Sequence, residues 1–238
     1  TVASFQVREV APDVLLLANL GAVQLNYGVG AAGCRRIVEM AQADALVLHF
    51  NALQEAVQPE GDTDFSGLLA KVEQVCTALA RDGVPVVAKE VGWGFSEETC
   101  RALAVAGVAA IDVAGAGGTS WSQVEMYRAE DETEKKVAAA FADWGISTAE
   151  ALRMARRGAP EIVAIASGGL RDGVEVAKCI ALGASLAGIA RPFLEAAVRS
   201  PEEVLQAVRV IERQLRISMF CAGAADIAAL QRTPLSHR

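Results

Sequence analysis

Short apolar runs alternate with longer amphipathic stretches along the chain, and this alternation constrains the fold more than any other feature. Six runs are rich in leucine or branched residues and end at glycine or polar residues: Val14–Ala18, Ala45–His49, Val84–Lys89, Ala109–Val113, Ile162–Ala166 and Leu186–Ile189. Buried parallel strands have this character. Helices are predicted over Cys34–Ala43, Phe65–Asp82, Glu97–Ala106, Thr148–Arg157, Gly173–Leu182 and Pro201–Ala222. The pattern predicts an α/β protein with a parallel sheet or barrel.

The position of the glycine-rich turns favours a barrel over a doubly wound sheet. A doubly wound nucleotide-binding sheet carries its glycine fingerprint after the first strand, but Asn19-Leu20-Gly21-Ala22 follows that strand here. The turns that suit a phosphate come instead after the last strands, as in TIM barrels. A TIM barrel has eight β/α units, and six are found. We therefore expect one domain over residues 1–238, a TIM (β/α)8 barrel whose first two units are absent from this sequence.

Composition excludes several classes of protein. The net charge of −7 lacks the basic excess of a nucleic-acid-binding protein, and no apolar run approaches the ~20 residues of a membrane span. The five cysteines are scattered without metal-ligand spacing, which is typical of a reduced, cytoplasmic protein. The two histidines, His49 and His237, exclude a multi-histidine metal site.

Two successive strand ends have the chemistry of an anion site. Ser167-Gly168-Gly169 links a strand to a helix, and Ala190-Arg191-Pro192 follows the next strand. Glycines let backbone N–H groups approach an anion, and a helix N-terminus adds a partial positive charge. Arg171 and Arg191 would add charge to this phosphate cradle. The alternative is that Gly168-Gly169 is only a tight turn.

A second glycine-rich loop, Ala114–Trp121, follows the fourth predicted strand. Such a loop can lie flat against a planar ligand, with Thr119 offering a hydroxyl and Trp121 a wall. A helix starting at this loop would place Glu125 on the face of Trp121. The alternatives are a plain flexible loop and an ordinary solvated glutamate.

Lys89 ends an apolar strand, where it is expected to point into the barrel mouth. A desolvated lysine needs a partner, such as an electron-rich ring or a phosphate. A salt bridge with Glu90 is disfavoured, because neighbouring strand residues face opposite sides.

The densest polar cluster is His49-Phe50-Asn51-Ala52-Leu53-Gln54-Glu55, at the end of the second predicted strand. An imidazole and amides suit hydrogen bonding to a diphosphate. A single carboxylate suits Mg²⁺, which keeps most of its waters and binds substrate oxygens. The alternative is a structural histidine among ordinary polar residues.

These segments occur together in one known family. The chain resembles the type 2 isopentenyl diphosphate isomerases in the His49–Glu55 cluster, Lys89-Glu90-Val91-Gly92, Ala114–Trp121, Ala166–Gly169 and Ala190-Arg191-Pro192, in the same order and over essentially all 238 residues. The histidine-to-glutamate cluster combined with Thr119-Ser120-Trp121 is specific, whereas the last two turns are shared with many FMN barrels.

The resemblance implies an FMN-dependent TIM-barrel isomerase that interconverts isopentenyl and dimethylallyl diphosphate. It also implies Mg²⁺ on the diphosphate, NADPH as reductant for a flavin that undergoes no net redox change, and a homo-oligomer (tetramer or octamer) in the cytoplasm. Flavin contacts would be Asn19, Lys89, Thr119, Gly168, Gly169, Arg171, Ala190 and Arg191. His49, Asn51 and Gln54 would bind substrate, Glu55 would hold Mg²⁺, and Gln54, Trp121 and Glu125 would surround the reacting carbons.

Moving a double bond requires adding one proton and removing another through a tertiary cationic transition state, which a reduced flavin and an indole face stabilise. No side chain is an obviously sufficient acid, so the flavin is expected to carry the proton. The family also has about a hundred preceding residues, with an Arg-Lys segment, two barrel strands and a Met-Thr-Gly-Gly loop, that this sequence lacks. Two alternatives are an FMN-dependent 2-hydroxy-acid oxidase, disfavoured because no histidine lies between His49 and His237, and an inactive flavin- or phosphate-binding partial barrel.

Overall fold

Six parallel strands form one sheet whose spatial order equals the chain order. The computed structural model describes residues 7–236, so His237 lies outside the described residues. The strands are β1 (Leu17–Gly21), β2 (Ala45–Phe50), β3 (Val86–Glu90), β4 (Ala110–Asp112), β5 (Val163–Ala166) and β6 (Leu186–Ala187). Every neighbouring pair is parallel, and β1 and β6 are the two edges of the sheet in the described part of the chain.

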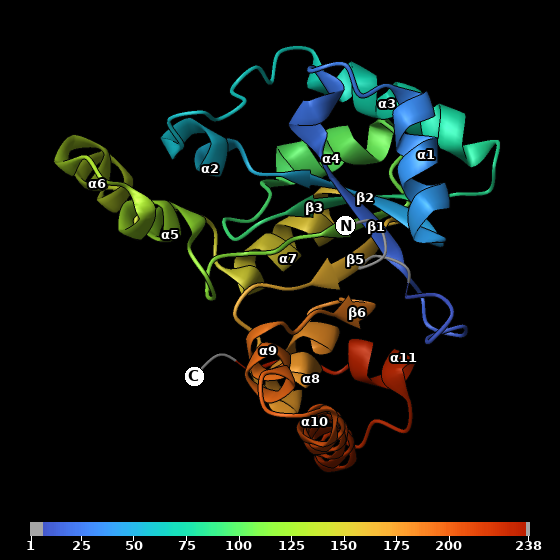
Figure 1. Cartoon of the computed structure of the whole chain (residues 1–238). Helices are drawn as coiled ribbons and strands as arrows, with labels where there is room; N and C mark the ends of the chain where they lie inside the picture. The colour runs from blue at the N-terminus through green and yellow to red at the C-terminus, as the bar shows by residue number, and fades with distance from the viewer. Residues whose placement is uncertain (1–6, 237–238) are drawn as a thin grey trace.

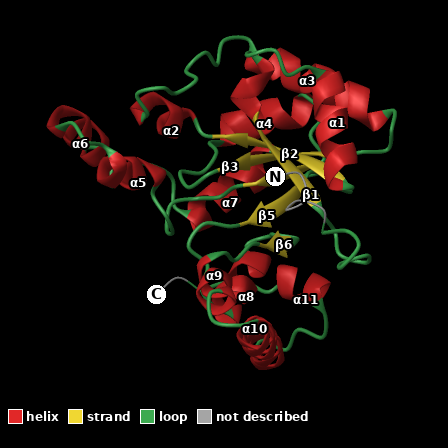
Figure 2. Cartoon of the chain, viewed as in Figure 1, coloured by secondary structure: helices red, strands yellow, loops and turns green. Residues whose placement is uncertain are grey.

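Helices occupy the connections between the strands and the C-terminal part of the chain (Figures 1 and 2). They are the 3-10 helix η2 (Ala22–Leu25) and the α-helices α1 (Ala31–Ala41), α2 (Ala52–Val57), α3 (Leu68–Ala80), α4 (Glu97–Val105), α5 (Trp121–Arg128), α6 (Glu132–Ala139), α7 (Thr148–Gly158), α8 (Gly173–Ala181), α9 (Arg191–Ala197), α10 (Pro201–Cys221) and α11 (Ile227–Gln231).

The two faces of the sheet are packed differently. One face carries Leu46, Leu48 and Ile111, each with no exposed surface, into the main core beneath the helices. The other face carries a small apolar layer in which Val47 packs with Val87. The helices therefore cover one face, and the opposite face is the inner face of a β/α barrel.

Helices α5 and α6 form an arm that projects away from the body (Figure 1). They pack on each other and on α2. Asp131 caps α6 by accepting the backbone N–H groups of Thr133 and Glu134. The arm connects β4 to α7, so its first helix starts beside the carboxyl end of the sheet.

The predicted alternation is confirmed, with shifts at the ends of the elements. The first strand is the largest correction, because it was predicted over Val14–Ala18 and begins at Leu17. The Val14 carbonyl accepts from Arg8 and the Leu16 N–H donates to the Asp44 carboxylate, so these backbone groups bond to side chains instead of a strand. The last strand ends at Ala187 instead of Ile189.

The predicted helix over Pro201–Ala222 is confirmed as α10, which lies on the outside of the structure. No helix in residues 7–236 combines the length and apolar character needed to cross a membrane.

Candidate active site

The carboxyl ends of β1 to β4 bring four residues into one row. The register pairs Gly21 with His49, His49 with Lys89, and Lys89 with Asp112. Residues at alternate positions of a strand share a face, so the row lies on the inner face with Val47. His49 and Lys89 were predicted to lie at strand ends, and the structure brings them together. Asp112 was not singled out from the sequence.

His49 is held by an asparagine on the neighbouring strand. Its Nδ1 lies 2.7 Å from Oδ1 of Asn19. A carbonyl oxygen only accepts, so Nδ1 carries the hydrogen and Nε2 of the neutral ring is an acceptor. Burial lowers the pKa of His49, as does the charge of Lys89, and the charge of Glu55 opposes them. The ring is therefore neutral at pH 7.

Lys89 has a carboxylate partner within the chain, and its contact with a ring or phosphate stays a prediction. Its Nζ lies 4.0 Å from Oδ2 of Asp112 and donates to the backbone carbonyl of Glu90 at 2.7 Å. Ser167 Oγ donates to the other Asp112 oxygen at 2.6 Å. Burial raises the pKa of Asp112, and the charge of Lys89 opposes that shift. This network joins the ends of β3, β4 and β5.

The polar cluster after β2 is organised by Asn51, the N-cap residue of α2. Its Nδ2 donates to Glu55 Oε1 at 2.7 Å and lies 3.4 Å from Gln54 Oε1. The backbone N–H of Asp62 donates to the other Glu55 oxygen at 2.8 Å. The structure thus brings together Asn51, Gln54 and Glu55, as the sequence predicted.

The Asn51 side chain retains one unused binding group. Asn51 is 5% exposed, and its Oδ1 has no hydrogen-bond partner among the described residues. A buried carbonyl oxygen without a donor is costly, so this atom suits a donor or metal-bound water from a ligand. Residues 7–236 contain no group of three or more His, Cys, Asp or Glu side chains placed to hold a metal ion. Mg²⁺ at Glu55 would therefore need water and substrate for its other ligands.

Glu125 lies on α5 and is buried, with 7% of its surface exposed. This excludes the alternative interpretation as a solvated glutamate. Gln58 Nε2 donates to Glu125 Oε1 at 2.8 Å. Trp121 begins the same helix and is 37% exposed, so the indole and the carboxylate differ in burial. Sequence reasoning missed Gln58, because no local signal points to a partner 67 residues away.

The two glycine-rich segments pack against each other. A Cβ on Gly168 would lie 2.1 Å from the Gly115 carbonyl oxygen, and one on Gly169 would lie 2.1 Å from that of Gly117. Gly168 and Gly169 also have positive φ values of 105° and 79°. Thr148 Oγ1 donates to the Gly168 carbonyl at 2.6 Å. The glycines are therefore required for contact between the loops after β4 and β5.

Backbone donors remain at the ends of β5 and β6. The N–H groups of Gly168, Gly169, Ile189 and Ala190 donate no hydrogen bond to the described part of the chain. Free N–H groups at neighbouring strand ends are suitable donors to a phosphate. Their position agrees with the predicted phosphate cradle.

Each of the two predicted arginines pairs with a glutamate four residues further along the chain. Arg171 pairs with Glu175 of α8, and Arg191 pairs with Glu195 of α9 at 2.7 Å. Their side chains are 77% and 87% exposed. Among the described residues, neither side chain has a hydrogen bond to the Gly168-Gly169 turn. Thr119 is also exposed, and its carbonyl would lie 2.9 Å from a Cβ on Gly92.

Glu90 is a further organising residue that sequence reasoning did not single out. One of its carboxylate oxygens accepts the backbone N–H groups of residues 91, 92, 93 and 94, at 2.5–3.1 Å. Glu90 is 8% exposed, and burial raises its pKa against these hydrogen bonds. It therefore fixes the loop after β3, next to Lys89.

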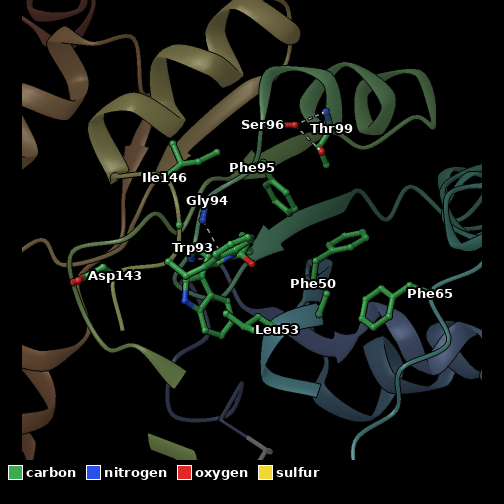
Figure 3. A pocket seen from close by; sticks show the side chains of 14 residues that line it. Phe50, Leu53, Phe65, Trp93, Gly94, Phe95, Ser96, Thr99, Asp143 and Ile146 are labelled. Atoms are coloured by element: carbon green, nitrogen blue, oxygen red, sulfur yellow. Dashed lines mark hydrogen bonds between the residues drawn. The ribbon is translucent and has the colours of Figure 1, made fainter. Parts of the chain in front are cut away.

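An open hollow of about 630 Å³ lies beside this loop (Figure 3). Its wall includes the aromatic side chains of Phe50, Phe65, Trp93, Phe95 and Trp144. Phe50 and Phe95 pack edge to face at 5.6 Å between ring centroids. None of the residues predicted to bind cofactor or substrate lines the hollow, although Phe50 and Glu90 directly follow His49 and Lys89 on their strands.

Comparison with known proteins identifies relatives over nearly the whole chain. The family model of the FMN-dependent dehydrogenases matches residues 29–237. Proteins named isopentenyl-diphosphate delta-isomerase are 53% identical over 232 residues in a Synechococcus species, 54% over 230 in Stutzerimonas stutzeri and 47% over 235 in Rickettsia bellii. These alignments cover 98%, 97% and 99% of the chain but 66%, 66% and 68% of the relatives. The chain thus spans about two thirds of their length.

Solved structures share the fold at low identity. A putative lactate oxidase of Pediococcus acidilactici aligns with TM-score 0.67 and 17% identity over 98% of the chain and 64% of its own. GMP reductase of Trypanosoma brucei aligns with TM-score 0.62 and 22% identity over 90% and 45%.

Proposed function

Because the chain belongs to the FMN-dependent dehydrogenase family, and within it to the isopentenyl-diphosphate delta-isomerases, we propose that it takes part in an FMN-dependent interconversion of isopentenyl and dimethylallyl diphosphate. One observation carries the proposal: the His49–Glu55 cluster lies beside Lys89 at the carboxyl ends of the strands. Diphosphate-binding groups and a cation are thereby gathered at the barrel face where such enzymes bind their ligands.

The flavin would be held by residues from β1, β3 and the later loops. We assign it Asn19, Lys89, Thr119, Gly168, Gly169, Arg171, Ala190 and Arg191. The N–H groups of Gly168, Gly169 and Ala190, which donate to no group in residues 7–236, support this assignment, because they suit the flavin phosphate. Arg171 and Arg191 would have to leave their glutamate partners to reach it. When bound and reduced, with NADPH as electron source, the flavin supplies an electron-rich ring and a proton-carrying site.

The diphosphate and Mg²⁺ would lie at the cluster after β2. Asn51 offers its unpaired Oδ1 to a metal-bound water, and Glu55 offers the single carboxylate to Mg²⁺. His49 is neutral without ligand, and an adjacent diphosphate would favour the protonated ring. Nε2 would then donate to a phosphate oxygen while Nδ1 stays bonded to Asn19.

Gln54, Trp121 and Glu125 would surround the carbon skeleton. A tertiary cationic transition state is stabilised by an indole face and by a carboxylate with little exposure to water. Trp121 and Glu125 supply these two groups from one helix, and Gln54 would orient the substrate from α2. These residues would position and stabilise the reacting carbons.

The cysteines and the outer surface of α10 bear on where the protein works and how it assembles. Free, mostly buried cysteines support a reduced, cytoplasmic environment, and exposed apolar residues on α10 such as Leu205 and Phe220 support a homo-oligomer. A 2-hydroxy-acid oxidase is disfavoured, because its histidine base has no counterpart among residues 50–236.

The test is a product assay on isopentenyl diphosphate with FMN, NADPH and Mg²⁺. We expect dimethylallyl diphosphate to form and to disappear from the products when FMN or Mg²⁺ is omitted. Glu55→Gln should abolish the Mg²⁺ dependence and most activity. Glu60 is an exposed glutamate shortly after α2, and Glu60→Gln should behave as wild type. Absence of product with every component present, from protein that binds FMN, would refute the proposal.

A further inference from the structure

Gln58 joins two segments of the proposed site without belonging to either set of assigned residues. It is the C-cap residue of α2, three positions after Glu55. Its amide donates to Glu125 on α5 at 2.8 Å, across 67 positions of the chain. Helices α2 and α5 also pack on each other. The bond therefore connects the diphosphate-side helix to the helix on the carbon-skeleton side.

The backbone of Gln58 is fixed before its side chain reaches across. Its N–H donates to the Gln54 carbonyl at 3.1 Å, which closes the last turn of α2. Pro59 follows, and a residue before proline is held in the extended region, in agreement with the φ of −84° and ψ of 132° at Gln58. The backbone position from which the Gln58 side chain extends is therefore fixed.

The amide provides the short hydrogen bond to Glu125. Arg128 approaches the same Oε1 at 3.4 Å, but the Arg128 side chain is 66% exposed. The Arg128 guanidinium lies mostly in water, which screens its charge, although the carboxylate itself is buried. The amide of Gln58 is neutral, so it orients the carboxylate without adding a second cation beside its negative charge. That charge is what a neighbouring cationic transition state requires.

We propose that Gln58 is a positioning residue that orients the Glu125 carboxylate toward the carbon skeleton of the isoprenyl diphosphate. The inference rests on the proposed function, in which Glu125 faces that skeleton. It assigns to Gln58 a role in the rate of the reaction and none in holding FMN, Mg²⁺ or the diphosphate.

The test uses two substitutions in the FMN-loaded protein. Gln58→Met keeps the length of the side chain and removes its donor, whereas Gln58→Ala removes both. We expect each to lower kcat about 10- to 100-fold, the size of effect that misplacement of a catalytic group produces. KM for isopentenyl diphosphate, the Mg²⁺ concentration for half-maximal activity and the FMN affinity should stay at wild-type values.

Gln123→Met is the matched control. Gln123 lies on the same helix and donates to the Ala138 carbonyl of α6 at 3.1 Å, so this variant also loses an amide hydrogen bond of α5. It should retain wild-type kcat. Wild-type kcat in Gln58→Met would overturn the inference, as would an equal loss in Gln123→Met, because the effect would then reflect only the placement of α5.

A stability measurement separates the two proposals. The shift in denaturation midpoint of Gln58→Met with Glu125→Gln should differ from the sum of the single shifts, because the residues are in direct contact. If the wild-type protein makes no product, the proposed function is refuted, and with it the role of Gln58 in that reaction. A non-additive shift in denaturation midpoint would still establish the contact between Gln58 and Glu125. Additive shifts would refute the contact and hence the positioning role, whatever the activity.

Discussion

The ammonium nitrogen of Lys89 lies 4.0 Å from Oδ2 of Asp112, on the next strand in the same register row. Asp112 is 8% exposed and has its other carboxylate oxygen bonded to Ser167. The pair therefore places a cation at the strand ends and holds together three neighbouring strands.

Lys89→Met should destabilise the protein by about 1–3 kcal/mol at pH about 7.5, because it leaves a buried carboxylate without its cation. The pKa of Asp112 is already raised and should rise further in the variant. A carboxylate whose native pKa is raised lowers the free energy of unfolding at pH values above that pKa, where it is charged. This loss disappears as the group becomes protonated, so the difference in stability between Lys89→Met and wild type, measured by urea denaturation, should shrink toward acid pH. Lys135→Met, in the exposed pair with Glu132, should cost less than about 1 kcal/mol, and an equal loss in both variants would contradict the argument.

Gly168→Ala should destabilise the protein by about 3 kcal/mol or more. The new Cβ would lie 2.1 Å from the Gly115 carbonyl, and alanine is strained at the φ of 105°. Gly28→Ala is the control, because Gly28 has a φ of 96° and no atom lies within 4 Å of the position that a new Cβ would take there; it should lose only about 1 kcal/mol. Equal denaturation midpoints for the two variants would show that the loop contact is absent.

His49→Gln should weaken the pH dependence of stability. The native pKa of His49 is lowered, so the unfolded chain takes up a proton at this residue before the native protein does. The stability contributed by the neutral ring is complete above the unfolded pKa of about 6.5 and is lost as pH falls toward the native pKa. Between pH about 7.5 and about 5, wild type should lose more stability than His49→Gln. His237 is common to both proteins, so its titration cancels, and parallel curves would contradict the assignment.

One of the five cysteines should react rapidly with a thiol reagent in the native protein. Cys221 is exposed, whereas burial raises the pKa of Cys76, Cys100 and Cys179 to about 11 and also raises that of Cys34. The thiolate is the reactive species. Labelling should yield one fast thiol, none in Cys221→Ser, and five for wild type in denaturant; several fast thiols in the native protein would contradict the described burial.

The helices and strands were predicted from local sequence patterns. The errors in the strands lie at boundaries that are set by contacts with residues distant in the sequence. Hydrophobic periodicity located all six strands, but the start of β1 depends on pairing between Leu17 and Ala45. No helix was predicted over Ala52–Val57, which follow the second strand as part of a polar cluster and form α2. Asn51 is the N-cap residue of that helix, and Glu55 lies one turn after it.

The candidate site was predictable as a set of strand ends but not as a set of contacts. His49 and Lys89 follow apolar runs, so their shared location could be inferred. Asp112 was hidden because only the register shows it opposite Lys89. The spacing of four residues is enough to predict the pairing of Arg171 with Glu175. The sequence analysis instead expected Arg171 to face a phosphate.

The level register of the first four strands also limits how this protein can change. Side chains alternate between the two faces of a strand, so inserting one residue within a strand turns all that follows to the other face. One extra residue in β2 would exchange His49 for a neighbour on the inner face, and the same holds for Lys89 in β3. Insertions and deletions should therefore fall in the connections between the strands, where a change in length leaves the row undisturbed, as the α5–α6 arm after β4 does. Variation in chain length among related proteins is in this way confined by geometry to the segments outside the strands.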